Sequence, residues 1–162
     1  LAGFLEDALD AACAANRFPR PRLVVEPGRA ISGHAGVTLH RVQSVSVRTD
    51  GRAVVTVDGS HPQSAPAANY TVALANRHPL GPTRVSTVVG RDGSVIADDL
   101  DLPDDVHSGD LLATACTGAY HHSMASNFTM TTRPPVIAVC DRRVRPLIRR
   151  ETTADLLLRD CG

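Results

Sequence analysis

Apolar residues in most of this chain fall into short runs rich in valine and threonine, and polar turn residues separate the runs. Runs of this length and composition, divided by Asp-Gly, Gly-Asp and Pro-containing turns, are typical of β-strands. Seven strands are predicted within residues 36–49, 52–59, 69–77, 83–90, 110–116, 134–140 and 143–150. So many short strands with little helix between them predict an antiparallel sandwich or barrel.

A different pattern occupies the start of the chain. Within residues 3–16, apolar side chains recur at a spacing of four and form one face of an amphipathic helix. These side chains are Phe4, Leu5, Ala8, Leu9 and Ala12. Prolines in residues 17–22 end the helix, because proline cannot continue one. Residues 23–26 then form a short apolar strand of the kind that is buried on both faces of a parallel sheet.

This helix, strand and following loop resemble one α/β unit of a barrel or doubly wound sheet, in which ligands collect at the carboxyl ends of the strands. One such unit cannot build an α/β domain, so the parallel neighbours of residues 23–26 either lie outside this sequence or are absent from the molecule. Two further helical segments are predicted in the β region. Residues 118–128 form a short helical turn, and residues 151–160 form a closing helix that Thr152 or Thr153 caps.

Composition and charge describe an ordinary globular protein. The chain has 43% apolar residues and a formal net charge of zero, which does not fit a nucleic-acid-binding surface. No apolar run approaches the roughly 20 residues that span a bilayer. The first 16 residues carry acids and lack the basic start of a signal peptide. We therefore expect a cytoplasmic protein without a nucleic-acid or membrane partner.

The cysteines, histidines and lysines limit the chemistry. Cys13, Cys116, Cys140 and Cys161 lie far apart in sequence and make neither a zinc motif nor a disulfide framework. We expect buried or idle thiols in a reducing compartment. His121 and His122 are adjacent and point different ways, so they make a poor metal pair. All 17 basic residues are arginine, so this chain alone cannot complete a reaction that needs a lysine Schiff base.

Several separated motifs point to one family. They are "LVVEPGRAISGHAGVTLHRV", "VDG", "LPDDVHSGDLLATACTGAYHHSMASNF", "RPPVIAV" and "RRET", in this order. Across nearly its whole length, the chain resembles the C-terminal portion of diaminopimelate decarboxylases, pyridoxal-phosphate-dependent enzymes of fold type III (alanine racemase-like). The resemblance implies a mainly β chain. Residues 1–33 would be the last helix and strand of a (β/α)8 barrel, and residues 34–162 a β domain with a short closing helix.

The resemblance also assigns roles to five residues. Glu26, Pro27 and Gly28 would line the phosphate of pyridoxal phosphate, Pro27 by presetting the turn and Gly28 by offering a backbone N–H at close approach. Arg29 would reach a substrate carboxylate as a bidentate donor. The Tyr120 hydroxyl would lie near both the phosphate and the substrate. The structural alternatives are a β-turn with an ion pair between Glu26 and Arg29, and a half-buried packing role for Tyr120.

Two stretches depart from the family pattern. The family has a Cys-Glu-Ser-Gly-Asp motif that reaches into the partner subunit's active site, but here Asp92-Gly93 makes a tight hairpin without a cysteine. Asp92 is the alternative for the missing acid. After "VDG", residues 60–70 replace a loop whose arginine and tyrosine read the far end of diaminopimelate, and the arginine is absent. Charged recognition of a distal carboxylate is therefore not expected here.

Two functions stay open. In the first, which we favour, the chain is the C-terminal part of a working pyridoxal-phosphate-dependent amino-acid decarboxylase, for lysine-type biosynthesis or a specialised pathway. Its expected partners are an amino-acid substrate and a lysine-bearing barrel portion, within a homodimer or heteromer. In the second, the chain is a degenerate homologue that acts as a dimerisation or regulatory module and catalyses nothing. The intact motifs favour the first function, and the missing Cys-Glu loop favours the second.

Overall fold

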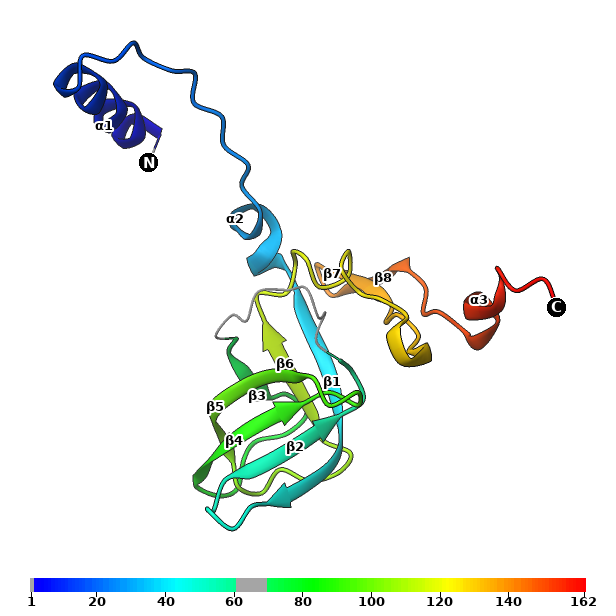
Figure 1. The fold of residues 1–162 in the computed structure, drawn as a ribbon. Helices are drawn as coiled ribbons and strands as arrows, with labels where there is room; N and C mark the ends of the chain where they lie inside the picture. Colours follow the sequence, from blue (N-terminus) through cyan, green and yellow to red (C-terminus); the bar gives the residue numbers. More distant parts are fainter. Residues whose placement is uncertain (1, 61–69) are drawn as a thin grey trace.

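The computed structural model describes residues 2–60 and 70–162, and its largest part is a small β-barrel (Figure 1). The six strands of this barrel are β1 (Val37–Val47), β2 (Ala53–Val57), β3 (Val72–Leu74), β4 (Thr83–Val89), β5 (Val95–Pro103) and β6 (Leu111–Ala115). Their order in the sheet is β3-β6-β1-β2-β4-β5. The two edge strands, β3 and β5, contact each other, so the sheet nearly closes on itself. A mainly β chain with a barrel is therefore confirmed.

Strand pairing departs from the prediction at one place. The pairs β1–β2, β1–β6, β3–β6 and β4–β5 are antiparallel, whereas β2 and β4 run parallel. The parallel pair arises because the chain leaves β2, forms β3 on the far side of the sheet and returns to form β4 beside β2. The long strand β1 serves two neighbours, since its first half pairs with β6 and its second half with β2, with a bulge between Val42 and Ser44.

The barrel interior holds the hydrophobic core. Side chains alternate between interior and exterior along β2, where Ala53, Val55 and Val57 are buried. The rest of the core comes from Val42, Val72, Val88, Ile96, Ala97, Leu102, Val106 and Leu112. Fully burying one valine or leucine side chain contributes about 1.5–3 kcal/mol, so these residues supply most of the drive for folding. The valine-rich runs of the sequence therefore lie where the pattern predicted.

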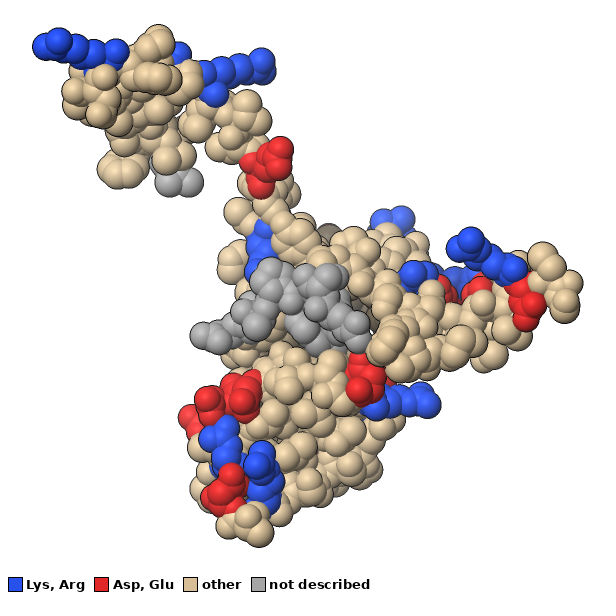
Figure 2. Space-filling view, in the orientation of Figure 1, with Lys and Arg blue, Asp and Glu red and all other residues tan. Residues whose placement is uncertain are grey.

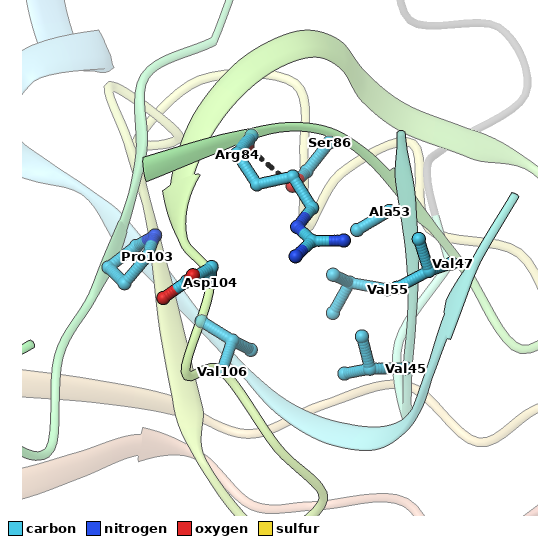
Figure 3. Close-up of a pocket in the computed structure, with 9 residues that line it drawn as sticks. All are labelled: Val45, Val47, Ala53, Val55, Arg84, Ser86, Pro103, Asp104 and Val106. Atoms are coloured by element: carbon cyan, nitrogen blue, oxygen red, sulfur yellow. Dashed lines mark hydrogen bonds between the residues drawn. The ribbon is translucent and has the colours of Figure 1, made fainter. Parts of the chain in front are cut away.

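One small cavity opens at the end of the barrel where β1 finishes (Figure 3). It has a volume of about 20 Å³ and is lined by Val45, Val47, Ala53, Val55, Arg84, Ser86, Pro103, Asp104 and Val106. Figure 3 shows the Arg84 guanidinium reaching in over the valine side chains. Such a volume holds about one water molecule. The cavity is therefore too small for an organic cofactor, and it lies at the opposite end of β1 from the motif residues around Gly36.

A hairpin and a short helix follow the barrel. Strands β7 (Val136–Cys140) and β8 (Arg143–Ile148) form a separate two-stranded sheet, and α3 (Thr153–Leu157) closes the chain. The hairpin turn at Asp141 and Arg142 has positive φ at both positions, 49° and 60°, as a two-residue primed turn requires. Thr152 caps α3 through a capping box with Asp155, which confirms the predicted cap. Most of the hairpin's large apolar side chains are exposed, and a lone hairpin is marginally stable in water.

The chain before the barrel stands apart from it. Helix α1 (Ala2–Ala15) has no buried residue, and a long extended segment joins it to α2 (Arg29–Ser32) and the 3₁₀ turn η1 (Gly33–Ala35) (Figure 1). The strand predicted at residues 23–26 does not form, and Val24 is 70% exposed. A strand of the parallel type needs neighbours on both sides, and this chain provides none. Because its expected neighbours lie outside this sequence, the strand at residues 23–26 stays a prediction.

Charged side chains are unevenly spread over the molecule. Figure 2 shows them gathered at the end of the barrel away from α2, beside α1 and along the C-terminal segment, with largely uncharged surface between. Within the described part of the chain, no helix is long and apolar enough to cross a membrane. Over the same residues, no group of three or more His, Cys, Asp or Glu side chains is arranged to hold a metal ion.

Candidate cofactor and substrate site

The Glu-Pro-Gly-Arg motif opens a helical turn rather than a β-turn. Gly28 precedes the first residue of α2, and its carbonyl accepts a hydrogen bond from the Ile31 N–H at 3.1 Å. Glu26 and Pro27 are exposed, and no ion pair joins Glu26 to Arg29 in the described structure. The alternative of a β-turn with a surface ion pair is therefore wrong, and the Arg29 side chain has other neighbours.

Arg29 lies between two tyrosines. Its Nη2 donates to the Tyr70 hydroxyl at 3.1 Å, and its guanidinium carbon lies 5.9 Å from the Tyr70 ring centre and 5.4 Å from that of Tyr120. Both distances are within the range of a cation–π contact. The Arg29 Nε is buried and has no hydrogen-bond partner among the described residues. A buried N–H normally finds an acceptor, so this group is available to an anion that enters the site.

Gly28 and Tyr120 are in direct contact. A β-carbon at Gly28 would lie 1.9 Å from the Tyr120 hydroxyl oxygen, so the tyrosine occupies the space that a side chain at position 28 would need. Tyr120 has a positive φ of 72° and is 41% exposed. The Tyr120 hydroxyl therefore lies beside the Gly28 backbone, and its predicted place near a phosphate and a substrate stays a prediction. The alternative of a half-buried packing role for Tyr120 stays open, because its ring also contacts Gly28 and Arg29.

The register of β1 and β6 explains why the two motifs meet. Val37, the first residue of β1, is opposite Ala115, the last residue of β6, so the segment before β1 lies beside the segment after β6. The Gly118 N–H donates to the Gly33 carbonyl at 3.0 Å. A β-carbon at Gly36 would lie 2.3 Å from the Gly118 Cα, so the two backbones touch. These contacts fix the Glu-Pro-Gly-Arg and Thr-Gly-Ala-Tyr motifs in one place.

Two residues of the site, Tyr70 and His121, were not predicted as site residues from the sequence. Tyr70 is only 6% exposed and packs edge-on against His121, with ring centres 5.1 Å apart and planes at 82°. Tyr70 belongs to the segment 60–70, of which residues 61–69 lie outside the described part of the chain. The one available signal was that Tyr70 and Tyr120 are the chain's two tyrosines. His121 and His122 are both half-buried.

Glu151 of the Arg-Arg-Glu-Thr motif clamps the loop that follows Tyr120. Its carboxylate accepts from the Arg133 backbone N–H at 2.7 Å, from Asn127 Nδ2 at 2.7 Å and from Arg133 Nη1 at 2.8 Å. The hydrogen bond from the Arg133 N–H, with smaller contributions from the Asn127 and Arg133 side chains, holds the pKa of Glu151 below its usual value. This motif therefore ties the loop after Tyr120 to the C-terminal segment.

Asp110 of the Gly-Asp-Leu motif has a structural role too. It is 1% exposed and accepts from Arg77 Nε at 2.8 Å and Arg77 Nη2 at 2.7 Å, in a bidentate pair. Asn76 Nδ2 and the His107 N–H complete its partners. The hydrogen bonds from Arg77 hold the pKa of Asp110 far below its usual value. The carboxylate is fully used and lies within the fold, so we assign it no ligand.

The predicted hairpin at Asp92-Gly93 is present between β4 and β5. The Gly93 N–H donates to the Gly90 carbonyl at 3.0 Å, and Gly93 has a φ of 81°. The Asp92 carboxylate accepts from the N–H of Ser94 at 3.1 Å and from its hydroxyl at 2.6 Å. Asp92 therefore stabilises its own turn, and nothing in the described structure assigns it the role of the missing acid.

Comparisons with known proteins identify relatives of the chain. No family model matches it. The diaminopimelate decarboxylase of Actinosynnema pretiosum subsp. auranticum is 49% identical over 160 residues, which cover 94% of this chain and 36% of that enzyme. The diaminopimelate decarboxylase of Mycobacterium leprae is 38% identical over 89% of this chain and 33% of its own length. The resemblance that the motifs predicted is thereby confirmed.

Solved structures give the same result. The crystal structure of a diaminopimelate decarboxylase from M. jannaschii in complex with L-lysine matches with a TM-score of 0.76 and 27% identity, over 94% of this chain and 36% of that one. The chain thus spans about a third of the length of the relatives that it matches. The six-stranded barrel agrees with the β domain of that fold.

Proposed function

We propose that this chain, a homologue of diaminopimelate decarboxylases, is one part of a pyridoxal-phosphate-dependent amino-acid decarboxylase. It supplies contacts to the cofactor phosphate and to a substrate carboxylate, while a lysine-bearing barrel portion supplies the rest of the site. The observation that carries the proposal is the position of Arg29, which lies between Tyr70 and Tyr120 with a buried Nε that has no partner among residues 2–60 and 70–162.

The residues present fit an anionic cofactor and substrate. The Arg29 Nε needs an acceptor, and a carboxylate or phosphate oxygen is the strongest one available in proteins. The absence of a side chain at Gly28 leaves room for the Tyr120 hydroxyl to reach the Pro-Gly backbone. No lysine or acidic side chain lies among the contacts that the described residues make with Arg29, so nothing within these contacts competes with an incoming anion.

Each residue then has a distinct task. Arg29 binds the substrate carboxylate, and the two tyrosine rings hold its guanidinium plane in one orientation before the substrate arrives. Tyr120 donates its hydroxyl proton in a hydrogen bond to a phosphate oxygen, and Gly28 keeps that hydroxyl close to the backbone. Pyridoxal phosphate, when bound, supplies the electron sink that decarboxylation requires. This chain contributes binding and orientation, and it contains no lysine to hold the cofactor covalently.

The exposed start of the chain supports the need for a barrel partner. Leu23, Val24 and Val25 form an apolar run that is more than half exposed, and no residue of α1 is buried. A run of this kind is buried on both faces when parallel strands flank it. We therefore propose that residues 1–33 complete a barrel whose other strands lie in another segment or chain, and that residues 34–162 form the β domain.

One observation, the short turn between β4 and β5, supports a second function, that of a non-catalytic association module. The four-residue turn at Gly90–Gly93 leaves no loop that carries a cysteine and an acid toward another subunit. If those groups are essential for catalysis, the chain serves for association with a related barrel. In that case the complex forms but releases no carbon dioxide.

A chimera tests the two functions against each other. The homologous third of the Actinosynnema pretiosum diaminopimelate decarboxylase is replaced by this chain, and carbon dioxide release is measured with diaminopimelate, lysine, ornithine and arginine. Release from any of the four supports the decarboxylase. A folded chimera that releases none from the full panel contradicts it and supports the association module. The barrel portion without this chain is the control for background activity.

A further inference from the structure

A thiol and an imidazole face each other just outside the proposed site. Cys116 Sγ lies 3.3 Å from His34 Nδ1, although the two residues are 82 positions apart in sequence. Both side chains are exposed. Cys116 has a φ of 60°, in the left-handed region that non-glycine residues adopt at a cost of about 1–3 kcal/mol when the surrounding structure holds them there. The pair is therefore built by the tertiary fold and not by local sequence.

The geometry is that of a nucleophile beside its base. With the ring proton on Nε2, Nδ1 accepts a hydrogen bond from the thiol, and it can take the proton when the sulfur attacks an electrophile. Exposed thiols beside a histidine react faster than isolated ones, because the thiolate is the reactive form. Among the described residues, the other two exposed cysteines have no histidine partner. The Cys140 thiol points to the Asp141 carboxylate at 3.5 Å, and the Cys161 thiol points to a backbone carbonyl at 3.9 Å.

We propose that Cys116 and His34 form a modification site that is selective for small electrophilic disulfides. In the reaction, the Cys116 sulfur attacks one sulfur of a low-molecular-weight disulfide such as oxidised glutathione, and the S–S bond of that disulfide breaks. A mixed disulfide forms on Cys116, and one thiolate leaves. His34 takes the Cys116 proton and passes it to the departing thiolate, so no further oxidant or reductant is needed.

The position of Cys116 gives the modification a structural consequence. Cys116 directly precedes Thr117 and Gly118, whose N–H groups donate to the Gly36 and Gly33 carbonyls at 3.0 Å each. These two hydrogen bonds join the segment that carries Arg29 to the segment that carries Tyr120. An adduct on Cys116 removes the thiol proton, and with it the hydrogen bond that the thiol donates to His34 beside this junction. The site itself needs only the chain described here and does not depend on the proposed decarboxylase.

Cysteine labelling of the 162-residue chain tests the proposal. The chain is treated with a limiting amount of oxidised glutathione at neutral pH, and peptide mass spectrometry measures the modification rate at each of the four cysteines. We expect Cys116 to react at least about tenfold faster than Cys140 and Cys161, because His34 takes the thiol proton as the sulfur attacks. H34N should bring the Cys116 rate down to that of Cys140, while leaving the Cys140 and Cys161 rates unchanged.

Two results overturn the proposal. One is a Cys116 rate equal to those of Cys140 and Cys161 in the unmodified sequence. The other is a fast Cys116 rate that H34N leaves unchanged, because the histidine then has no role. A circular dichroism spectrum equal to that of the natural sequence shows that H34N is folded, and C116S identifies the fast-reacting peptide.

Discussion

Gly28 and Tyr120 are matched to each other, because a β-carbon at position 28 would lie 1.9 Å from the Tyr120 hydroxyl oxygen. One residue opens α2 and the other follows β6, and the hydrogen bond from Gly118 to Gly33 holds their segments together. The glycine of the Glu-Pro-Gly-Arg motif is therefore required by the tyrosine of the Thr-Gly-Ala-Tyr motif. This pairing has a direct consequence for substitution.

G28A should displace the Tyr120 hydroxyl and weaken cofactor binding. In the chimera we expect the Kd for pyridoxal phosphate to rise about tenfold, the value of one hydrogen bond to a charged group. Tyr120 is 41% exposed and can swing outward, so the thermal midpoint should change little. Fluorescence titration measures the Kd. G3A is the matched control, since a β-carbon at Gly3 meets nothing within 4 Å. Equal Kd values for the two variants would show that the contact has no role in binding.

The two tyrosines that flank Arg29 should separate into different roles. Y70F removes the acceptor of the Arg29 Nη2 hydrogen bond and leaves the ring in place. We expect the KM for the amino acid to rise about tenfold, because a hydrogen bond to a charged group is worth about 1.5–3 kcal/mol. Y120F should raise both the KM and the cofactor Kd modestly. Steady-state kinetics of the chimera measure these effects. A cofactor Kd that changes in Y70F but not in Y120F would reverse the assignment.

The buried pair of Asp110 and Arg77 should dominate the stability of the barrel end. D110N removes the bidentate acceptor of Arg77 but leaves its ion pair with Asp105, so we expect a loss of about 2 kcal/mol in the free energy of unfolding at pH 7. Urea unfolding measures the loss. D98N is the control, because Asp98 forms an exposed ion pair with Arg52 and such pairs contribute about 0–1 kcal/mol. Equal losses of unfolding free energy in D110N and D98N would contradict a stabilising role for the buried Asp110 carboxylate.

The pair of Asp110 and Arg77 should also make the free energy of unfolding depend on pH. Because the folded state lowers the pKa of Asp110, the stabilisation is fully present above the unfolded pKa of about 3.9 and is lost as the pH falls toward the folded value. The difference in unfolding free energy between the natural sequence and D110N should therefore be constant from pH 7 to pH 5 and shrink at pH 3. If this difference in unfolding free energy grew as the pH fell, it would contradict a lowered pKa of Asp110 in the folded state.

Glu151 should order the loop after Tyr120. E151Q keeps the shape of the side chain but removes the charge that accepts three hydrogen bonds, so the Arg133 N–H should exchange with solvent faster, by about tenfold. Hydrogen exchange with peptide-level detection measures this rate. E6Q, in the exposed helix α1, is the control and should leave the Arg133 segment unchanged. If the Arg133 N–H exchanged at the same rate in E151Q, Glu151 would not be what orders this loop.

The sequence located most strands because their valines are buried on a period of two, as along β2. It missed β5, whose acids Asp98, Asp99 and Asp101 interrupt the apolar pattern on the exposed face. The parallel pairing of β2 with β4 depends on how the barrel closes, and local pattern carries no information about closure. The strand expected at residues 23–26 lacks its neighbours and stays unpaired.

The site was predicted in part, and through the family resemblance rather than through local pattern. Gly28, Arg29 and Tyr120 lie close together, and the cofactor and substrate roles that the resemblance implied for them stay predictions. Tyr70 and the Cys116–His34 pair were not foreseen, because their contacts bridge 41 and 82 positions of sequence and are set by the register of the barrel strands. Residue type alone gives no sign of such long-range pairs.

The most direct test of the central claim is the Michaelis constant of R29A in the chimera. Arg29 is proposed to bind the substrate carboxylate while Tyr120 faces the phosphate, so its loss should affect the substrate more than the cofactor. We expect the KM for the amino acid to rise about 100-fold, as the loss of a charged, bidentate contact predicts, with less than a threefold change in the pyridoxal phosphate Kd. R91A, at the edge of the β4–β5 hairpin, is the control and should change neither constant. A KM that R29A leaves unchanged would contradict the account.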